Sequence, residues 1–223
     1  MTFSLLGVDR ETGMSGAVVS SSSPAVGARC VFVRAGVGAA ASQNVTDPRL
    51  GPRLLDLLAT GHTPRDAVDE VVRSAEDVAW RQLSAVDLEG RTASYSGERT
   101  LGRHATAERE GAVAAGNLLA DAPVLDAMLT AFAEPGDHLG DRLVAALRAG
   151  LEAGGEEGPV RSASLLVADR VAWPVADLRV DWSDDPIGEL KDLWVCWKPE
   201  LDTYVVRALD PDAAPSFGVP GDR

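Results

Sequence analysis

The spacing of apolar residues divides the chain into short strands and paired helices. Alternating or continuously apolar segments of about four to eight residues, bounded by Gly, Ser and Pro, are typical of β-strands. Because Leu88-Glu89-Gly90 separates two such segments, we expect a hairpin there. The predicted strands are Thr2–Val8, Ser15–Ser20, Cys30–Ala35, Trp80–Asp87, Arg91–Ser96, Gly111–Gly116, Ser162–Ala168 and Ala176–Asp181.

Helical spacing follows two proline-containing starts after the third of these strands. Asp47-Pro48 supplies an N-cap and a first helical residue, and an apolar stripe of leucines follows. Thr63-Pro64 repeats this arrangement, with Asp66 in the first turn, where a carboxylate favours the positive end of the helix dipole. The leucines of the first stripe are Leu50, Leu54, Leu55 and Leu58. We therefore predict two consecutive helices in this segment.

The second half of the chain repeats the pattern of strands followed by helices. A second helix pair is expected over about Pro123–Ala133 and Leu139–Ala153, and Gly154-Gly155 ends the latter helix. Asp185-Pro186 begins a final helical region. Because Pro199 interrupts its apolar stripe, we predict two short helices there rather than one long helix.

The order of these elements favours an α+β fold. Strands alternate with pairs of helices, whereas a doubly wound parallel sheet alternates strands with single crossover helices. We predict a sandwich of two mainly antiparallel sheets with the helices outside, forming one domain over residues 1–209. Residues 210–223 contain three prolines and are expected to form an irregular tail.

Composition and charge exclude several classes of protein. The 223 residues are 45% hydrophobic and 25% charged, as in a globular domain. A net charge of −13 opposes phosphate backbones and anionic lipid, so we expect neither nucleic-acid nor membrane binding. The apolar runs are too short for a membrane span, and the N-terminal segment lacks signal-peptide features. With two widely separated cysteines, Cys30 and Cys196, a cytoplasmic protein with free thiols is the expectation.

Motifs for cofactors and metals are weak in this sequence. Gly36–Ala41 matches the dinucleotide fingerprint G-x-G-x-x-A, but Asp47-Pro48 starts a helix too late for that motif, so a glycine-containing strand or bulge is the better interpretation. The histidines His62, His104 and His138 show no ligand spacing. We therefore expect no cofactor and no metal.

A run of serines follows the second predicted strand. Most hydroxyls of Ser20-Ser21-Ser22-Ser23-Pro24 are explained by a polar turn, yet hydroxyls at a strand end are well placed to bind a ligand. Ser20, Ser21 and Ser22 are accordingly candidates for substrate binding. Cys30 has no acidic or histidine neighbour in sequence, which favours a buried thiol.

Thr2 is the residue with the most specific chemistry. If Met1 is removed, the α-amino group of Thr2 lies on the same residue as its hydroxyl. This amine has an ordinary pKa of about 7.7–8.0 and can act as a general base for the hydroxyl, directly or through one water. Many proteins begin with Met-Thr without such a consequence, so this feature alone is a weak signal.

Several ordered motifs, taken together, resemble the bacterial family catalogued as domain of unknown function 1028, which is related to N-terminal nucleophile (Ntn) hydrolases. The resemblance covers nearly the whole chain and implies a four-layer αββα sandwich. The matching pieces are Met1-Thr2-Phe3-Ser4, Thr12-Gly13, Pro24-Ala25-Val26-Gly27, Arg34-Ala35-Gly36-Val37-Gly38-Ala39, Gln43-Asn44-Val45-Thr46-Asp47-Pro48, Gly116-Asn117 and Asp177-Leu178-Arg179-Val180-Asp181.

The resemblance implies roles for four residues. Thr2 is expected to be the nucleophile and base, and Asn117 to donate to an oxyanion. Arg34 lies about where proteasome-like members carry a lysine and is expected to give electrostatic support only, because arginine does not readily lose its proton. Asn44 is expected to hold substrate or to assist the oxyanion. Ser22 stands where many relatives have a basic residue, so a charged role for this loop is in doubt.

The leading hypothesis is a hydrolase of a small-molecule amide that acts by acyl transfer through Thr2. A non-catalytic ligand-binding or assembly domain with the same sandwich is the alternative, and an enzyme using Cys30 or the serine loop is a third. The apolar face around Trp194 and Trp197 suggests burial against the sandwich or a partner chain, and a homodimer is expected.

Overall fold

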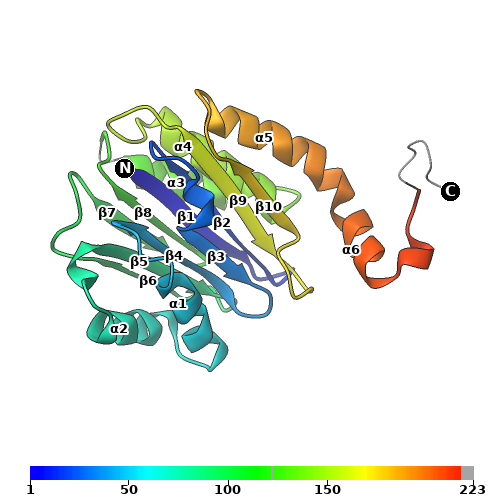
Figure 1. The fold of residues 1–223 in the computed structure, drawn as a ribbon, viewed down its shortest axis with the longest axis horizontal. Helices are drawn as coiled ribbons and strands as arrows, with labels where there is room; N and C mark the ends of the chain where they lie inside the picture. Colours follow the sequence, from blue (N-terminus) through cyan, green and yellow to red (C-terminus); the bar gives the residue numbers. More distant parts are fainter. Residues whose placement is uncertain (122, 217–223) are drawn as a thin grey trace.

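Two antiparallel sheets form the centre of the computed structural model, which describes residues 1–121 and 123–216 (Figure 1). Within this part of the chain, the larger sheet has six strands and the smaller has four. In sheet order, the larger contains β10 (Ala176–Val180), β9 (Ser162–Ala168), β2 (Met14–Ser21), β1 (Thr2–Asp9), β8 (Ala112–Asn117) and β7 (Ala105–Arg109). The smaller contains β3 (Val31–Arg34), β4 (Gly38–Asn44), β5 (Arg81–Asp87) and β6 (Thr92–Ser96).

Helices cover the outer face of each sheet. The pair α1 (Leu50–Ala59) and α2 (Pro64–Ser74) packs on the smaller sheet, and the pair α3 (Val124–Ala133) and α4 (Leu139–Glu152) packs on the larger. The helices α5 (Pro186–Trp197) and α6 (Leu201–Leu209) follow, and α6 extends away from the sandwich (Figure 1). The expected α+β sandwich of two antiparallel sheets is therefore confirmed. Short 3₁₀ turns occur at Val26–Ala28, Val78–Trp80, Lys198–Glu200 and Pro211–Ala213.

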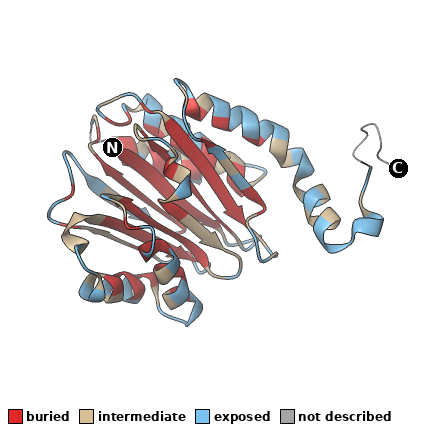
Figure 2. Ribbon diagram, in the orientation of Figure 1, coloured by how far each residue is buried: buried red, intermediate tan, exposed pale blue. Residues whose placement is uncertain are grey.

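The central strands of both sheets are almost wholly buried, whereas the edge strands are partly exposed (Figure 2). Successive residues of β1 point alternately to the helices and to the other sheet. Phe3 and Leu5 pack with α3 and α4, whereas Leu6 and Val8 pack in the cluster between the sheets. Thr2 is in step with Leu6 and Val8, so its side chain lies on the face between the two sheets.

Helix starts follow the predicted caps at two positions and depart at a third. The Thr63 hydroxyl accepts a hydrogen bond from the Asp66 backbone N–H at 3.2 Å, and the Asp185 carboxylate accepts from Gly188 N–H at 3.1 Å. Helix α1 begins at Leu50 rather than at Pro48. The Asp47 carboxylate is bound instead by the backbone N–H of Arg49 at 3.0 Å and by its guanidinium at 2.7 Å, which holds the intervening residues in a turn.

Two strands, β4 and β7, were not among the predicted elements. Gly36 lies in the turn between β3 and β4 with a φ of 72°, and Gly38 opens β4 with a φ of 143°. A Cβ atom at Gly38 would lie 2.1 Å from the Val86 carbonyl oxygen. The segment that matches G-x-G-x-x-A therefore forms a turn and the start of a strand, which agrees with the expected glycine-containing strand, while the hairpin itself was not predicted. Strand β7 lies at an edge and lacks a buried, alternating pattern.

Helix α5 packs against α4 and the larger sheet, and two of its tryptophans make these contacts. Trp194 is buried over Gly140, and its indole N–H donates to Asp141 at 2.8 Å. The Trp197 indole donates to the Val175 carbonyl at 2.9 Å. The apolar face of α5 thus packs against this chain, and the homodimer remains a prediction. The predicted break near Pro199 is confirmed, because a 3₁₀ turn separates α5 from α6.

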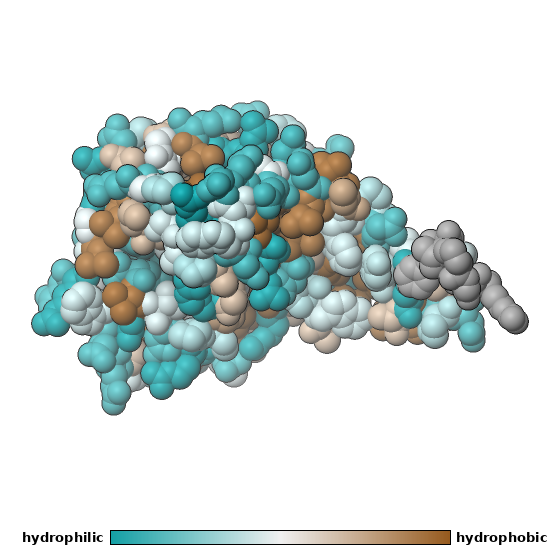
Figure 3. Space-filling model, turned by 45° about the horizontal axis from the view of Figure 1, so that its top comes forward, coloured by the Kyte–Doolittle hydropathy of each residue, from teal (hydrophilic) through white to brown (hydrophobic). Residues whose placement is uncertain are grey.

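The surface and the C-terminal tail add little regular structure. The face shown in Figure 3 is mainly hydrophilic, with scattered apolar patches. No helix among the described residues has both the length and the apolar character that a bilayer crossing requires. Of the predicted irregular tail, Pro211–Ala213 forms a 3₁₀ turn, and residues 217–223 lie outside the described residues.

Replacing Gly140 by alanine is expected to loosen the contact between α4 and α5. The added methyl would lie 2.4 Å from a ring carbon of Trp194, so the buried indole must shift. We expect Gly140→Ala to lower the free energy of unfolding by about 1–3 kcal/mol, measured by urea denaturation. The control Ala145→Ser, at an exposed position of α4, should change it by less than about 0.5 kcal/mol. Equal stabilities for the two variants would contradict this packing.

Candidate active site

The space between the sheets is apolar along most of its length and polar at one end. Apolar residues such as Leu6, Val19 and Val86 fill one part. The polar end is lined by buried side chains from both sheets, namely Thr2, Ser4, Ser21, Gln43, Gln82 and Asn117. Buried polar groups require hydrogen-bond partners, so this end is either a structural network or a binding site.

Strand pairing brings Thr2, Ser21 and Asn117 onto one face. Thr2 of β1 lies opposite Ser21 of β2 on one side and Asn117 of β8 on the other. Directly opposite residues of an antiparallel pair share a face of the sheet. The Thr2 hydroxyl lies 2.6 Å from the Met1 carbonyl oxygen and 3.3 Å from Ser21 Oγ. Three polar side chains therefore meet where β1 begins.

The Ser21 hydroxyl is oriented by its neighbours in the serine loop. The backbone N–H of Ser23 donates to Ser21 Oγ at 3.2 Å, and the two hydroxyl oxygens are 2.8 Å apart. Ser21 Oγ in turn hydrogen-bonds to the Met1 carbonyl. Because the oxygen of Ser21 already accepts a backbone hydrogen bond, its own proton is available to the Met1 carbonyl.

A network of amide side chains joins the two sheets behind Thr2. The Gln82 amide nitrogen lies 3.1 Å from the backbone oxygens of both Ala105 and Gly116, which fixes its orientation because backbone oxygens only accept. Gln82 Oε1 then accepts from Gln43 Nε2 at 2.8 Å and from Asn117 Nδ2 at 3.3 Å. Gln43 Oε1 accepts from the Ser4 hydroxyl at 2.7 Å.

This network determines which atom of Asn117 is available. Its Nδ2 faces Gln82, and its Oδ1 is buried with no hydrogen-bond partner among the described residues. The sequence-based expectation was a donor to an oxyanion. The structure instead leaves an acceptor unpaired, which suits a proton-bearing nitrogen better than a carbonyl oxygen.

Glu156 is a buried carboxylate beside this site that the sequence analysis missed. It lies in the segment between α4 and β9, forms a β-bridge with Leu119, and is 5% exposed. Burial raises the pKa of Glu156 to about 7. The Met1 ammonium and the Ser22 backbone N–H oppose this rise, although neither carboxylate oxygen meets hydrogen-bond geometry with a described group. The adjacent Glu157 is exposed. Because the two residues are of the same type and adjacent, the sequence alone does not show which of them is buried.

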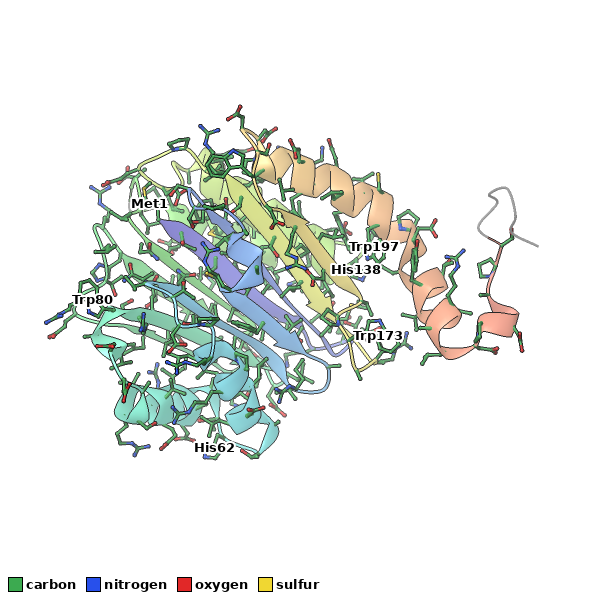
Figure 4. The ribbon with its side chains drawn as sticks, viewed as in Figure 1. Met1, His62, Trp80, His138, Trp173 and Trp197 are labelled. Carbon is green, nitrogen blue, oxygen red and sulfur yellow. The ribbon has the colours of Figure 1, made fainter. Side chains whose placement is uncertain are left out.

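Met1 fills the space in front of these groups. Its carbonyl contacts Thr2 and Ser21, and its ammonium is near enough to Glu156 to lower the pKa of that carboxyl. A methyl group added at Gly158 would lie 2.8 Å from Met1 Cε, so the side chain packs against this glycine. Figure 4 shows Met1 at one end of the sheets, away from His62 and His138.

Ser20 and Arg34, two of the expected site residues, do not lie beside Thr2. Ser20 lies on the opposite face of β2, where its hydroxyl donates to the Ser162 carbonyl at 3.0 Å. Arg34 pairs with Gly38, whose carbonyl binds Ser15 at the far end of β2, and its guanidinium binds Asp56 at 2.8 Å. The structure thus separates Arg34 from Thr2 by the length of the sheet.

Asn44 is held by main-chain groups. Its Nδ2 donates to the Trp80 carbonyl at 2.6 Å, its Oδ1 accepts from the Leu101 N–H at 3.2 Å, and its φ is 75°. These contacts give Asn44 a role in anchoring loops of the smaller sheet. Ser22 is half-buried beside Ser21, where its backbone N–H faces Glu156.

Burial disfavours the charged forms of Cys30 and His138. Cys30 is buried, and burial raises the pKa of its thiol, which lowers the fraction of reactive thiolate. His138 caps α4 by accepting from the Gly140 N–H at 3.0 Å, and burial lowers its pKa. Within residues 1–121 and 123–216, no group of three His, Cys, Asp or Glu side chains is arranged to hold a metal ion.

Comparison with known proteins gives a family. The model of the family of unknown function DUF1028 matches residues 2–190. The chain belongs to this family. A DUF1028 protein from Silicibacter pomeroyi, solved by crystallography, is 34% identical, with a TM-score of 0.81 over 87% of this chain and 88% of that chain. No functionally curated protein matches.

The DUF1028 match includes every residue of the candidate site except Met1. Thr2, Ser21, Asn117 and Glu156 all lie within residues 2–190. Helix α6 and the tail lie beyond the matched range. The family assignment therefore concerns the sandwich and its polar end, and it leaves the activity open.

Gln82 should contribute strongly to the stability of the sandwich. Gln82→Leu removes the donor to two backbone carbonyls and the acceptor for two amides, and three of these four hydrogen bonds are buried. We expect a loss of about 2–4 kcal/mol in the free energy of unfolding, measured by urea denaturation. Ser96→Ala, which removes one peripheral partner of Gln82 at 3.0 Å, should cost about 1 kcal/mol. A neutral Gln82→Leu variant would contradict the network.

Glu156 should make stability depend on pH in an unusual direction. Its pKa is raised from 4.5 to about 7 on folding, so its contribution is full below pH 4.5 and is lost as pH rises through 7. Glu156→Gln removes this dependence. We expect the unfolding free energy of Glu156→Gln minus that of wild type to increase by about 1–3 kcal/mol between pH 4 and pH 8. Glu157→Gln is the control, and a difference for Glu156→Gln that stays constant with pH would refute the assignment.

Proposed function

We propose that this chain is an Ntn-type hydrolase that uses Thr2 to cleave a small-molecule amide. One observation carries the proposal: the Thr2 hydroxyl, buried at the polar end between the sheets, lies against the Met1 carbonyl together with the Ser21 hydroxyl. Loss of Met1 would turn Thr2 into a residue that carries both a nucleophile and an amine at this position.

The proposed reaction is an acyl transfer in two steps. The Thr2 amine, with a pKa of about 7.7–8.0 in the absence of perturbation, takes the hydroxyl proton as Oγ1 attacks the amide carbonyl carbon. The proton passes to the leaving nitrogen as the C–N bond breaks, which leaves an ester on Thr2. Water activated by the same amine then releases the acid and restores the hydroxyl.

The neighbours of Thr2 have defined parts in this mechanism. The Met1 carbonyl marks where a substrate carbonyl would lie, so the Ser21 hydroxyl would polarise it. Asn117 Oδ1, which has no partner among the described residues, would accept an N–H from the Thr2 amine. We assign no catalytic part to Arg34, because its ion pair with Asp56 lies at the other end of the sheets.

The fold supports the proposal without carrying it. The layers run helix pair, smaller sheet, larger sheet, helix pair, which is the order of the αββα sandwich of Ntn hydrolases. A fold is shared by catalytic and non-catalytic proteins, so the argument depends on the residues around Thr2. A ligand-binding or assembly domain would keep the Gln82 network without needing a free Thr2 amine.

The first test combines intact mass with activity. We expect the purified protein to lack Met1 and to hydrolyse members of a panel of small amides. Thr2→Ala should lower kcat at least about 1,000-fold, because no other group supplies the nucleophile. Thr2→Ser should keep part of the activity, since it retains both hydroxyl and amine.

A matched control and a clear contrary result complete this test. Thr130→Ala, at an exposed position of α3, should behave as wild type. Full retention of Met1 would block the amine and favour the ligand-binding or assembly domain. Turnover that survives Thr2→Ala would also refute the proposal.

A further inference from the structure

The candidate site already holds one chemical group in full, the methionyl residue at the start of the chain. Its carbonyl oxygen contacts the Thr2 and Ser21 hydroxyls, its ammonium acts on Glu156, and its side chain packs against Gly158. Each part of this residue thus faces a group of matching chemistry. These groups come from three separate segments: β1, β2 and the loop between α4 and β9.

This space corresponds to the acyl side of the proposed reaction. The nitrogen and the hydroxyl oxygen of Thr2 are separated by two carbon atoms, and the Met1 carbonyl lies within hydrogen-bond distance of that hydroxyl. An acyl group attached to Oγ1 would therefore occupy nearly the place of the methionyl group attached to nitrogen. Its carbonyl would stay beside Ser21, and its α-substituents would point toward Glu156 and Gly158.

Glu156 is the charged group in this space that lacks a hydrogen-bond partner among the described residues. Only 5% of the Glu156 residue is exposed to solvent. Both of its carboxylate oxygens are buried, and neither forms a hydrogen bond with a described group. A buried carboxylate without a partner is costly, and an ammonium ion is the group that relieves this cost most effectively. In this structure the nearby cation is the Met1 ammonium.

We propose that the substrates are amides of α-amino acids with a free amino group, and that Glu156 binds the substrate's ammonium. This inference rests on the proposed function of Thr2. Ser21 then binds the carbonyl, and Gly158 leaves room for a side chain as long as that of methionine. Glu156 is a specificity residue that contacts the substrate, and it takes no part in breaking the amide bond.

The reaction consumes one water and releases an amino acid and an amine. Thr2 Oγ1 forms an ester with the aminoacyl carbon as the C–N bond breaks, and the proton from the hydroxyl leaves with the departing amine. Water then cleaves the ester and returns a proton to Oγ1. The substrate's ammonium remains protonated on Glu156 throughout, so no oxidant, reductant or further reactant is needed.

The test uses protein that lacks Met1 and two amides that differ only in the amino group. L-methioninamide carries the ammonium, and 4-(methylthio)butanamide lacks it; ammonia release measures turnover of both. We expect wild type to prefer L-methioninamide and Glu156→Gln to lose at least about 30-fold in kcat/KM for this substrate, mainly through KM. Turnover of 4-(methylthio)butanamide should be unchanged by Glu156→Gln, and Glu157→Gln should match wild type on both.

Gly158→Ala gives a second test that does not depend on the folding of Glu156→Gln. The added methyl would lie 2.8 Å from the position of Met1 Cε. It should reduce turnover of L-methioninamide and leave turnover of glycinamide, which has no side chain, close to wild type. Equal losses on both amides would overturn the placement of the side chain.

Two further outcomes separate this inference from the proposed function. Equal loss on both methionine-like amides in Glu156→Gln would mean that Glu156 serves the Thr2 amine, which overturns the inference and leaves the hydrolase standing. If no amide is hydrolysed, the proposed function fails, and calorimetric titration with L-methionine still tests the subsite. Binding to wild type that is lost in Glu156→Gln supports it, and absence of binding overturns it.

Discussion

The hydrogen bonds of Gln82 determine how the two sheets meet at their polar end. Two sheets packed face to face normally exclude polar side chains from the layer between them. Here Gln82 fills that layer and is bound to backbone oxygens of Ala105 and Gly116, to Gln43 and to Asn117. Because backbone oxygens only accept hydrogen bonds, the Gln82 nitrogen must face them and its Oε1 must face the other way. The side-chain nitrogens of Gln43 and Asn117 must then point toward Gln82 Oε1. The position of an unpaired Asn117 Oδ1 follows from this chain of contacts.

Around this network, some of the described polar groups have hydrogen-bond partners and others do not. Ser21 accepts from Ser23 and hydrogen-bonds to the Met1 carbonyl, so its hydroxyl has a fixed direction. Glu156, by contrast, is buried without good hydrogen-bond geometry, and its pKa is raised accordingly. A directed hydroxyl beside a poorly solvated carboxylate creates a site with a donor at one side and a negative charge at the other. Such a site discriminates ligands by the placement of both groups.

The sequence predicted most of the fold because its signals are local. The Thr63 and Asp185 caps, the Gly90 turn and the break at Pro199 each depend on neighbouring residues. Strand β7 was missed because an exposed edge strand needs no apolar alternation. The site was predicted only in part. Thr2, Ser21 and Asn117 meet through strand register. Thr2 was a candidate for its own chemistry, Ser21 for its place at a strand end and Asn117 through the family resemblance. Arg34 and Ser20 lie apart from Thr2, which the sequence could not reveal because the order of strands and the facing of side chains depend on the whole sheet. Burial of Glu156 but not of Glu157 depends on a bridge to Leu119, which no spacing reveals.

The unpaired groups at this end of the sandwich carry an energetic cost, which is consistent with the proposed site. A buried polar atom without a partner costs about 1–3 kcal/mol, which is a large part of the stability of a single domain. Most of the inter-sheet layer avoids this cost with apolar residues such as Leu6 and Val19, although Ser164 Oγ of β9 is also buried without a partner among the described residues. Asn117 Oδ1 and both Glu156 carboxylate oxygens incur it at the end of the sandwich where Thr2 lies. Departures from good packing and pairing that gather in one place are typical of sites at which a ligand supplies the missing partners. In the proposed reaction, the empty protein bears this cost and substrate binding relieves it, so the same groups that weaken the fold would add to substrate affinity.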